Sequence, residues 1–176
     1  MVTTTRRTWL VLVVLAMALS GSSASGQTPW DLGKKAVGGA AAGTLEKEGN
    51  KRLLEESRKN QCSFKSDSDE LTKGCDPKAK RLATALVNAK KRLESAGVRS
   101  FKYEVSGHTD SSGSAAHNEE LSLKRAERMR KELAAKGVPE GDITAVGRGS
   151  KQRLVQPDDT PAKKAKNRRY EEQVRL

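Results

Sequence analysis

Apolar residues recur at helical spacing in two stretches of the chain. In the first, Asp76 and Pro77 supply an N-cap followed by proline at the first helical position, and Gly97 supplies the stop. This pattern predicts an amphipathic helix over residues 76–97, whose apolar face is formed by Leu82, Leu86, Ala89 and Leu93.

The second helix is predicted over residues 118–137. Asn118 is a suitable N-cap, and the two glutamates that follow it favour the positive end of the helix dipole. Gly137 ends the helix, with Pro139 just beyond it. The side chains expected to face the core are Ala126, Met129 and Leu133.

Four short segments have the composition of strands. They span residues 62–66, 100–107, 142–147 and 169–175, and a short helix is expected after Thr160. The second segment is the clearest, because its apolar and charged residues alternate. The order β-α-β-α-β-(α)-β predicts an α+β fold, with a small mixed sheet and helices on one face.

The first 60 residues differ in pattern from the rest. Residues 1–26 contain two arginines, an apolar run and small residues in that order, which is typical of a cleavable signal peptide. A retained membrane anchor is the alternative, but the run has about 11 residues where a spanning helix needs roughly 20. Residues 27–60 are interpreted as a tether, partly helical and irregular or marginally helical in its glycine-containing first half. The globular domain is expected over residues 61–176.

The charge balance indicates an anionic partner. The formal net charge is +12, and loss of Arg6 and Arg7 with a signal peptide would leave +10. Nucleic acid is the usual partner of such a basic chain, but an exported protein more often meets peptidoglycan stems or anionic lipid headgroups. Aromatic residues make up only 3% of the chain and do not interleave with the basic ones as a base-stacking platform would, so no nucleic acid is expected.

The two cysteines, Cys62 and Cys75, are an even number in a chain expected to be exported. A disulfide between them is therefore predicted, and two unpaired thiols are the alternative. Closing a loop of this length would stabilise the fold by roughly 3 kcal/mol.

Several short motifs follow one another in the C-terminal half of the chain. They are GHTD at 107–110, NEELS at 118–122, RA at 125–126, GV at 137–138 and NRR at 167–169. In this order they resemble the C-terminal domain shared by OmpA, the peptidoglycan-associated lipoprotein and the stator subunits of flagellar motors. The resemblance is clear over residues 100–176 and thinner over 61–99. It implies noncovalent, non-catalytic binding of peptidoglycan, without a metal or cofactor.

The resemblance implies that Asp110 and Arg125 grip the side-chain end of diaminopimelate in the peptide stem. Their chemistry fits this role, because a carboxylate accepts hydrogen bonds from an ammonium and a guanidinium matches a carboxylate with a planar fork. Arg125 would lie at the edge of the buried face of its helix, about 60° from the centre of the apolar stripe. The alternative is an ordinary surface salt bridge between the two residues, worth about 0 to 1 kcal/mol.

The same resemblance adds three residues to the expected ligand site. Asn118 would border the cleft as well as cap its helix, and Thr109 with the backbone N–H groups of residues 109–113 could donate to carboxylates of the stem. One of the two arginines in NRR is expected to face the ligand and the other to pair structurally; Arg168 is favoured for the ligand, but the sequence does not assign the two roles. His117 and Lys164 depart from the tyrosine and arginine common in the family, which affects contacts at the rim.

Two other functions are weighed against peptidoglycan binding. A zinc amidase acting on the same polymer would need a ligand set, but His108 and His117 come without an HExxH motif, a GxSxG motif or cysteine ligands. A basic module that binds anionic polymers nonspecifically is the second alternative. We therefore expect a periplasmic protein that is not an enzyme, with an outer-membrane protein as the candidate partner of residues 27–60.

Overall fold

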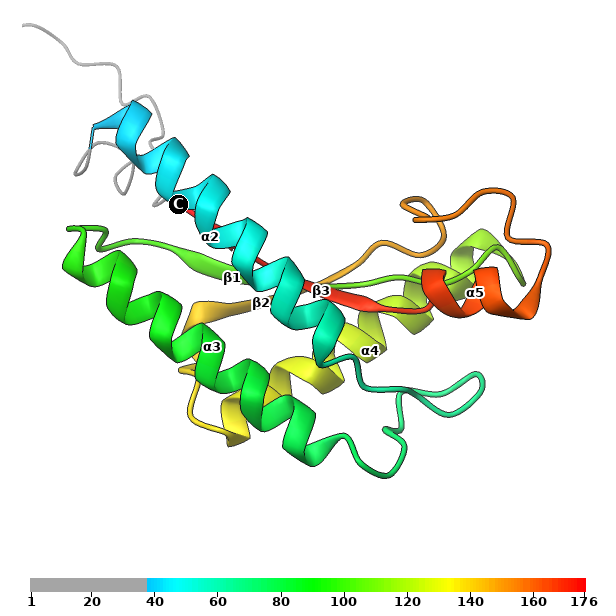
Figure 1. The fold of residues 1–176 in the computed structure, drawn as a ribbon. Coiled ribbons are helices and arrows are strands. Elements are labelled where there is room, and N and C mark those ends of the chain that lie inside the picture. The colour runs from blue at the N-terminus through cyan, green and yellow to red at the C-terminus, as the bar shows by residue number, and fades with distance from the viewer. Residues whose placement is uncertain (1–37) are drawn as a thin grey trace, which may run out of the picture.

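A computed structural model describes residues 38–176 of the chain, and the predicted signal peptide lies outside these residues. The described part has a mixed α+β fold, as predicted, but its sheet has three strands instead of four. In chain order the elements are α2 (Gly39–Lys59), α3 (Asp76–Ser95), β1 (Lys102–Gly107), α4 (Ala115–Ala135), the 3-10 helix η1 (Glu140–Asp142), β2 (Ile143–Gly147), α5 (Pro161–Asn167) and β3 (Tyr170–Arg175) (Figure 1).

The sheet has the strand order β2-β1-β3, with β1 parallel to β2 and antiparallel to β3. Tyr103 of β1 is paired with Ile143 on one side and with Val174 on the other. These three side chains are buried, whereas Lys102 and Glu104 on the opposite face of β1 are only partly covered. One face of the sheet therefore carries the core, and the other carries charged residues.

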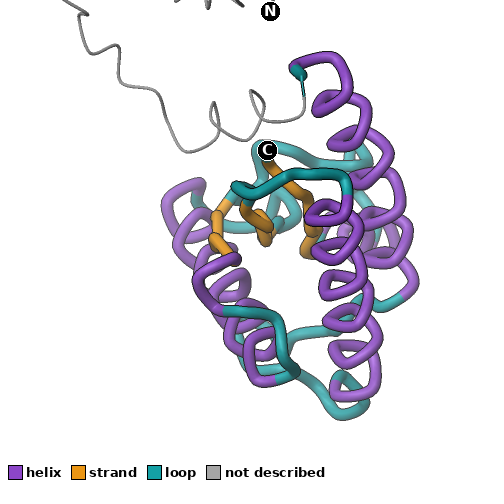
Figure 2. Tube along the Cα trace, turned by 90° about the vertical axis from the view of Figure 1, so that its left-hand side faces the viewer, coloured by secondary structure: helices purple, strands orange, loops and turns teal. Residues whose placement is uncertain are grey.

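The three long helices cover the apolar face of the sheet. Helix α4 packs against β1 and β2, α2 packs against β3, and α3 packs against both α2 and α4, an arrangement that Figure 2 shows along the strands. The predicted stripe residues of α3 and α4 meet in this core, where Leu82, Leu86, Met129 and Leu133 are fully buried. Burying each such side chain stabilises the fold by about 1.5 to 3 kcal/mol.

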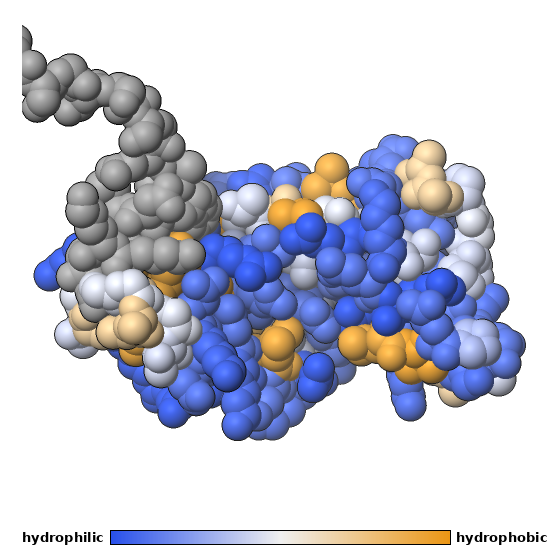
Figure 3. Space-filling view, turned by 90° about the horizontal axis from the view of Figure 1, so that it is seen from above, coloured by the Kyte–Doolittle hydropathy of each residue, from blue (hydrophilic) through white to orange (hydrophobic). Residues whose placement is uncertain are grey.

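The surface of the described residues is mostly polar. Figure 3 shows a largely hydrophilic face with small scattered apolar patches. The only large exposed hydrophobic residues among 38–176 are Leu123 and Leu154. No helix in this part of the chain is long and apolar enough to span a membrane.

The N-terminal segment differs from the predicted tether. Residues 39–59 form the continuous helix α2, including the glycines at 39 and 43 of the stretch that we expected to be irregular or marginally helical. Ala42 and Leu53 are buried against the rest of the core. Since these apolar contacts supply stability that helix propensity alone lacks, the helix is part of the folded body from Gly39 onwards.

Side chains from α2 and the residues after it cover the outer edge of β3. Asn50 donates to the Val174 carbonyl at 3.1 Å and accepts from the Val174 N–H at 2.6 Å. Gln61 makes the equivalent pair of bonds with the backbone of Tyr170, at 2.7 and 3.3 Å. These side chains occupy the edge that a fourth strand would pair with.

The strand predicted at residues 62–66 is wrong. Phe64 and Leu71 form only an isolated antiparallel bridge, within a loop closed by the predicted disulfide between Cys62 and Cys75. The Cα atoms of the two cysteines lie 5.0 Å apart. Side chains already cover the outer edge of β3, so this segment does not pair there, and it folds back on itself as a compact loop.

Candidate functional site

A cavity of about 710 Å³ lies where the disulfide loop, the end of β1 and the start of α4 come together. Its walls include residues 63–67 of the loop and the C-terminal part of α5. All five residues predicted to bind a ligand line this cavity, namely Thr109, Asp110, Asn118, Arg125 and Arg168. The fold thus brings together positions up to 59 residues apart in the sequence.

The GHTD segment sits at the carboxyl end of β1, close against α4. A Cβ atom at Gly107 would overlap the backbone carbonyl of Ser122 on α4, which explains the glycine at this position. The next two backbone N–H groups are also fixed, since His108 donates to the Arg169 carbonyl at 2.8 Å and Thr109 to the Gly149 carbonyl at 2.9 Å. Asp110 therefore projects from a rigid strand end.

Asp110 is paired with Arg168, and no ion pair joins it to Arg125. One carboxylate oxygen lies 2.7 Å from Nη1 of Arg168, and the other accepts the Ser112 N–H at 2.8 Å. Burial alone would raise the pKa of Asp110, but the bonds from Arg168 and Ser112 outweigh it and lower the pKa below its ordinary value. The carboxylate is held ionised in the cavity wall.

Hydrogen bonds to the Asp158 carboxylate hold the loop after Asp110, and the sequence did not predict them. The Ser111 backbone N–H and hydroxyl donate to Asp158 at 2.9 and 2.6 Å, and the Asn167 amide donates to the same carboxylate at 3.0 Å. The Ser111 hydroxyl bond is the largest of the influences that lower the pKa of Asp158. Asp158 thus ties the Asp110 loop to the segment that carries Arg168, although nothing in the polar stretch around it singled it out.

Asn118 is not the N-cap of its helix, contrary to our prediction. Helix α4 begins one turn earlier, where the Ser114 hydroxyl accepts the His117 N–H at 3.2 Å after a turn at Gly113 with φ 84°. Asn118 lies buried in the first turn and donates to the Ser112 carbonyl at 2.8 Å. It therefore closes the Asp110 loop against the helix and lines the cavity.

The disulfide loop holds the Arg125 side chain in place. Its Nε donates to the Ser68 carbonyl at 3.0 Å and its Nη2 to the Lys65 carbonyl at 3.3 Å, while the guanidinium lies 5.1 Å from the centre of the Phe64 ring. Burial, and next the charge of Arg168, lower the pKa of Arg125. The sequence predicted that Arg125 lies at the edge of the core, but it did not predict these hydrogen bonds from the disulfide loop.

Most backbone N–H groups of the 109–113 loop are already used. Those of Thr109, Ser111 and Ser112 donate to protein acceptors, so the prediction that the loop presents them to a ligand is wrong for these three. The Thr109 hydroxyl, in contrast, is buried without a hydrogen-bond partner among residues 38–176. This buried hydroxyl is therefore available to form a hydrogen bond with a ligand in the cavity.

The two arginines of NRR have different surroundings. Arg168 lines the cavity with 45% of its side chain exposed. Arg169 is outside the cavity lining, where it pairs with Glu171 at 2.8 Å and donates to the Gln152 carbonyl at 3.1 Å. The structure thus places Arg168, and not Arg169, in the wall of the cavity.

Two further side chains lie at the rim of the cavity. Lys164 donates to the Ser112 hydroxyl at 2.9 Å, and His117 lies 2.6 Å from the carboxylate of Asp67 on the disulfide loop. The His117 and Asp67 side chains are 50% and 68% exposed, so this contact bridges the mouth of the cavity in contact with solvent.

His108 lies behind the cavity wall. It is buried and outside the cavity lining, with Nε2 3.2 Å from the Ser106 hydroxyl. Burial, and next the charge of Arg169, lower its pKa to about 4, so the imidazole is neutral at physiological pH. Within residues 38–176 no three histidine, cysteine, aspartate or glutamate side chains gather as metal ligands would.

Comparison with known sequences assigns the family. The chain matches the model of the OmpA family over residues 63–168. Outer membrane porin F of Pseudomonas fluorescens is 48% identical over 71 residues, or 40% of this chain and 22% of the relative. Outer membrane protein A of Klebsiella pneumoniae is 51% identical over 45 residues, or 26% of this chain and 13% of the relative. The chain thus spans less than a quarter of the length of these curated relatives.

Solved structures share the fold. The peptidoglycan-associated lipoprotein from Burkholderia pseudomallei aligns with a TM-score of 0.54 and 24% identity, over 65% of this chain and 88% of that one. The C-terminal domain of Helicobacter pylori MotB aligns with a TM-score of 0.55 and 24% identity, over 66% and 84%. About two thirds of this chain therefore shares the overall fold of these structures.

Proposed function

Because this chain belongs to the OmpA family, we propose that it binds peptidoglycan noncovalently and without catalysis, through the diaminopimelate of the peptide stem. The observation that carries the proposal is the convergence of all five residues selected from the sequence on one cavity. They come from the end of β1, from α4 and from the residue after α5. These segments are far apart in the chain and meet only in the folded protein.

The charges in the cavity complement a ligand that carries both an ammonium and a carboxylate. Among the residues selected from the sequence, Asp110 is acidic, and Arg125 and Arg168 are basic. The side-chain end of diaminopimelate has these two opposite charges on one carbon atom. Its ammonium would bind Asp110, and its carboxylate would lie between the guanidinium groups.

The contacts of Arg125 define which part of it would meet the ligand. Its Nε and one hydrogen of Nη2 are used by carbonyls of the disulfide loop. The remaining donors are those of Nη1 and the second hydrogen of Nη2, which together form a fork suited to a carboxylate. The loop would thus fix the orientation of the fork before the ligand arrives, which lowers the entropy lost on binding.

Arg168 would act differently, because it is more exposed than Asp110, its ion-pair partner. Its side chain is 45% exposed, whereas that of Asp110 is 9% exposed. We infer that Arg168 turns partly from Asp110 to the ligand carboxylate when the ligand ammonium arrives. The exchange keeps Asp110 paired at every stage, which avoids leaving a buried charge alone.

We also propose that the protein works in the periplasm as a cell-envelope anchor. Its +12 charge and its family fit an exported protein beside an anionic polymer. An outer-membrane protein is the proposed partner of residues 27–60. The buried face of α2 is already used against β3, so such a partner would contact its outward face.

Sedimentation with purified peptidoglycan tests the function. We expect the wild type to sediment with diaminopimelate-containing sacculi and to be displaced by free diaminopimelate. Asp110→Asn and Arg125→Lys should remain in the supernatant, and the lysine variant is informative because it keeps the charge but loses the fork. Retention of both variants at the wild-type level would overturn the clamp.

Matched control variants separate the cavity from general charge. Asp159→Asn and Arg128→Lys make the same two substitutions in exposed ion pairs outside the cavity, and they should bind as the wild type does. Circular dichroism of each variant would show that the fold is intact. Release of soluble fragments from the sacculi by the wild type, abolished by a chelator, would instead support an amidase.

A further inference from the structure

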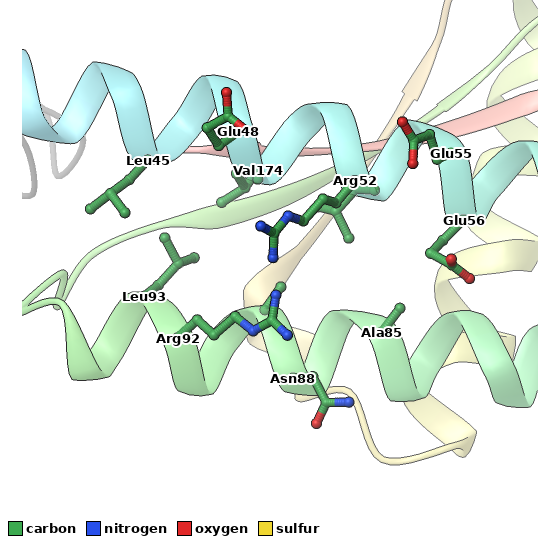
Figure 4. Close-up of a pocket in the computed structure, with 13 residues that line it drawn as sticks. Leu45, Glu48, Arg52, Glu55, Glu56, Ala85, Asn88, Arg92, Leu93 and Val174 are labelled. Atoms are coloured by element: carbon green, nitrogen blue, oxygen red, sulfur yellow. The ribbon is translucent and has the colours of Figure 1, made fainter.

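A second cavity, of about 520 Å³, lies in the groove between α2 and α3. It shares no lining residue with the proposed peptidoglycan site. Figure 4 shows Leu45 of α2 and Leu93 of α3 facing each other near one end of the groove. The apolar residues that line it are Leu45, Leu53, Ala85, Ala89, Leu93 and Val174.

Two arginines reach into this apolar groove from opposite sides. Arg52 comes from α2 and Arg92 from α3, and their guanidinium groups point toward each other (Figure 4). Among residues 38–176 neither forms an ion pair with a carboxylate, whereas Lys59 and Lys90 of the same helices do. The groove therefore holds two arginines without an ion-pair partner in the described chain, although three glutamates, Glu48, Glu55 and Glu56, also line it.

The neighbouring glutamates do not neutralise this pair. The carboxylates of Glu48 and Glu55 point away from the space between the helices in Figure 4. Glu56 lies at the far end of the groove, where it binds Lys59 at 3.3 Å. Two like charges above an apolar floor repel each other, and an anion placed between them would remove the repulsion.

We propose that this groove binds a single-chain amphiphile of the fatty-acid type. Its alkyl chain would lie along the apolar floor, and its carboxylate would bind between Arg52 and Arg92. Guanidinium groups match a carboxylate through paired hydrogen bonds, and burial of the chain contributes about 0.8 kcal/mol for each CH₂ group. The cavity volume lies within the range usual for small-ligand sites, about 300 to 1,000 Å³.

The surroundings of the groove favour a small ligand over a protein partner. A stable protein interface covers about 800 Å² on each partner and extends over neighbouring apolar surface. Leu123 and Leu154, the large exposed hydrophobic residues of the described chain, are not among the residues that line this groove. Neither of these exposed leucines therefore adds apolar surface to the lining of the groove.

Titration calorimetry of the protein with sodium dodecanoate, below its micelle concentration, tests this site. We expect saturable binding of one molecule, weakened about tenfold by Arg52→Gln or Arg92→Gln, since a charge-assisted hydrogen bond contributes about this much. Lys51→Gln and Lys91→Gln remove a charge from the adjacent positions, which do not line the groove, and they should bind dodecanoate as the wild type does.

Substituting an alanine on the floor of the groove gives a second, independent test. Ala89→Phe should fill the cavity and abolish binding, while circular dichroism and the melting temperature report whether the helices remain folded. Ala85→Leu is the milder alternative if Ala89→Phe unfolds. Asp110→Asn should bind dodecanoate normally, because it belongs to the other cavity.

Four results would overturn the proposal. Dodecyltrimethylammonium could bind as tightly as dodecanoate, which would show that the arginines do not select the anion. The two lysine variants could lose as much affinity as the arginine variants. An acidic amphipathic helical peptide or phosphatidylglycerol vesicles could bind while dodecanoate does not. Finally, dodecanoate could show no saturable binding at all.

Discussion

The guanidinium of Arg168 lies 2.7 Å from the carboxylate of Asp110, and this ion pair joins the residue after α5 to the end of β1. The acidic group of the cavity is therefore already neutralised before a ligand binds. In the proposed clamp the ligand ammonium replaces part of this contact. The strength of the Asp110–Arg168 pair should consequently control both the pKa of Asp110 and the affinity for peptidoglycan.

Replacing Arg168 should raise the pKa of Asp110. In Arg168→Gln the carboxylate loses its strongest stabilising partner while its burial is unchanged, so the pKa moves upward. A lowered pKa stabilises the folded protein above the pKa of the unfolded chain, and this stability is lost as pH falls, so the variant should lose less of it on acidification. Carbon-detected NMR titration of the Asp110 carboxyl group measures the shift.

Arg169→Gln is the control for this prediction. Arg169 pairs with Glu171 outside the cavity lining, so its replacement should leave the pKa of Asp110 nearly unchanged. Equal pKa values for Asp110 in the wild type and in Arg168→Gln would contradict the role of the ion pair.

Opening the Cys62–Cys75 disulfide should weaken peptidoglycan binding as well as stability. The loop that it closes supplies the carbonyls of Lys65 and Ser68 to Arg125. The double variant Cys62→Ser with Cys75→Ser should lose about 3 kcal/mol of stability in denaturant unfolding. Its binding should also fall at a temperature where it is fully folded, because Arg125 is no longer oriented.

A double-mutant cycle distinguishes orientation from a general loss of stability. If the loop acts through Arg125, opening the disulfide in Arg125→Lys should cause little further loss of binding. Independent, additive losses from the two changes would show that the loop acts in another way.

The buried carboxyl group of Glu172 should make stability depend on pH. Glu172 is fully buried beside Ser57 of α2, and one of its oxygens has no hydrogen-bond partner among the described residues. Burial raises the pKa of Glu172 to about 8. Folding therefore favours the protonated form, and this contribution is complete below about pH 4.5 and is lost as pH rises to about 8.

Glu172→Gln should abolish this part of the pH dependence. Its free energy of unfolding should exceed that of the wild type by an amount that grows between pH 5 and 8, on the order of a few kcal/mol. Urea unfolding of both proteins across this range measures the difference, and the comparison cancels the effects of the other carboxylates. Parallel curves for the two proteins would contradict the prediction.

The close packing of β1 against α4 should make Gly107 sensitive to substitution. In Gly107→Ala the added methyl group would meet the backbone carbonyl of Ser122, which cannot move as a flexible side chain can. We expect a loss of about 1 to 3 kcal/mol in thermal unfolding. Gly141→Ala is the matched control, since nothing lies within 4 Å of its added Cβ, and its stability should be almost unchanged.

Helix and strand patterns predicted most of the fold because the core of this protein uses regular spacing. The stripe of Ala126, Met129 and Leu133 is buried as expected, and Tyr103 and Val105 face the core from β1. The failures concern segments whose structure depends on neighbours. The residues expected to form the first strand are a loop. The helical part expected in the tether is present as α2, but it packs against β3 as part of the folded body.

The sequence by itself determined the chemical types of the candidate site and most of the elements that carry them. Local spacing and motif order are sufficient for this, because they depend on residues near one another in the chain. The tertiary structure decided the partners: Arg168 is paired with Asp110, and Arg125 is held by the disulfide loop. Such pairings join residues about 60 positions apart, and they follow from how helices and loops pack around the sheet, which no local pattern specifies.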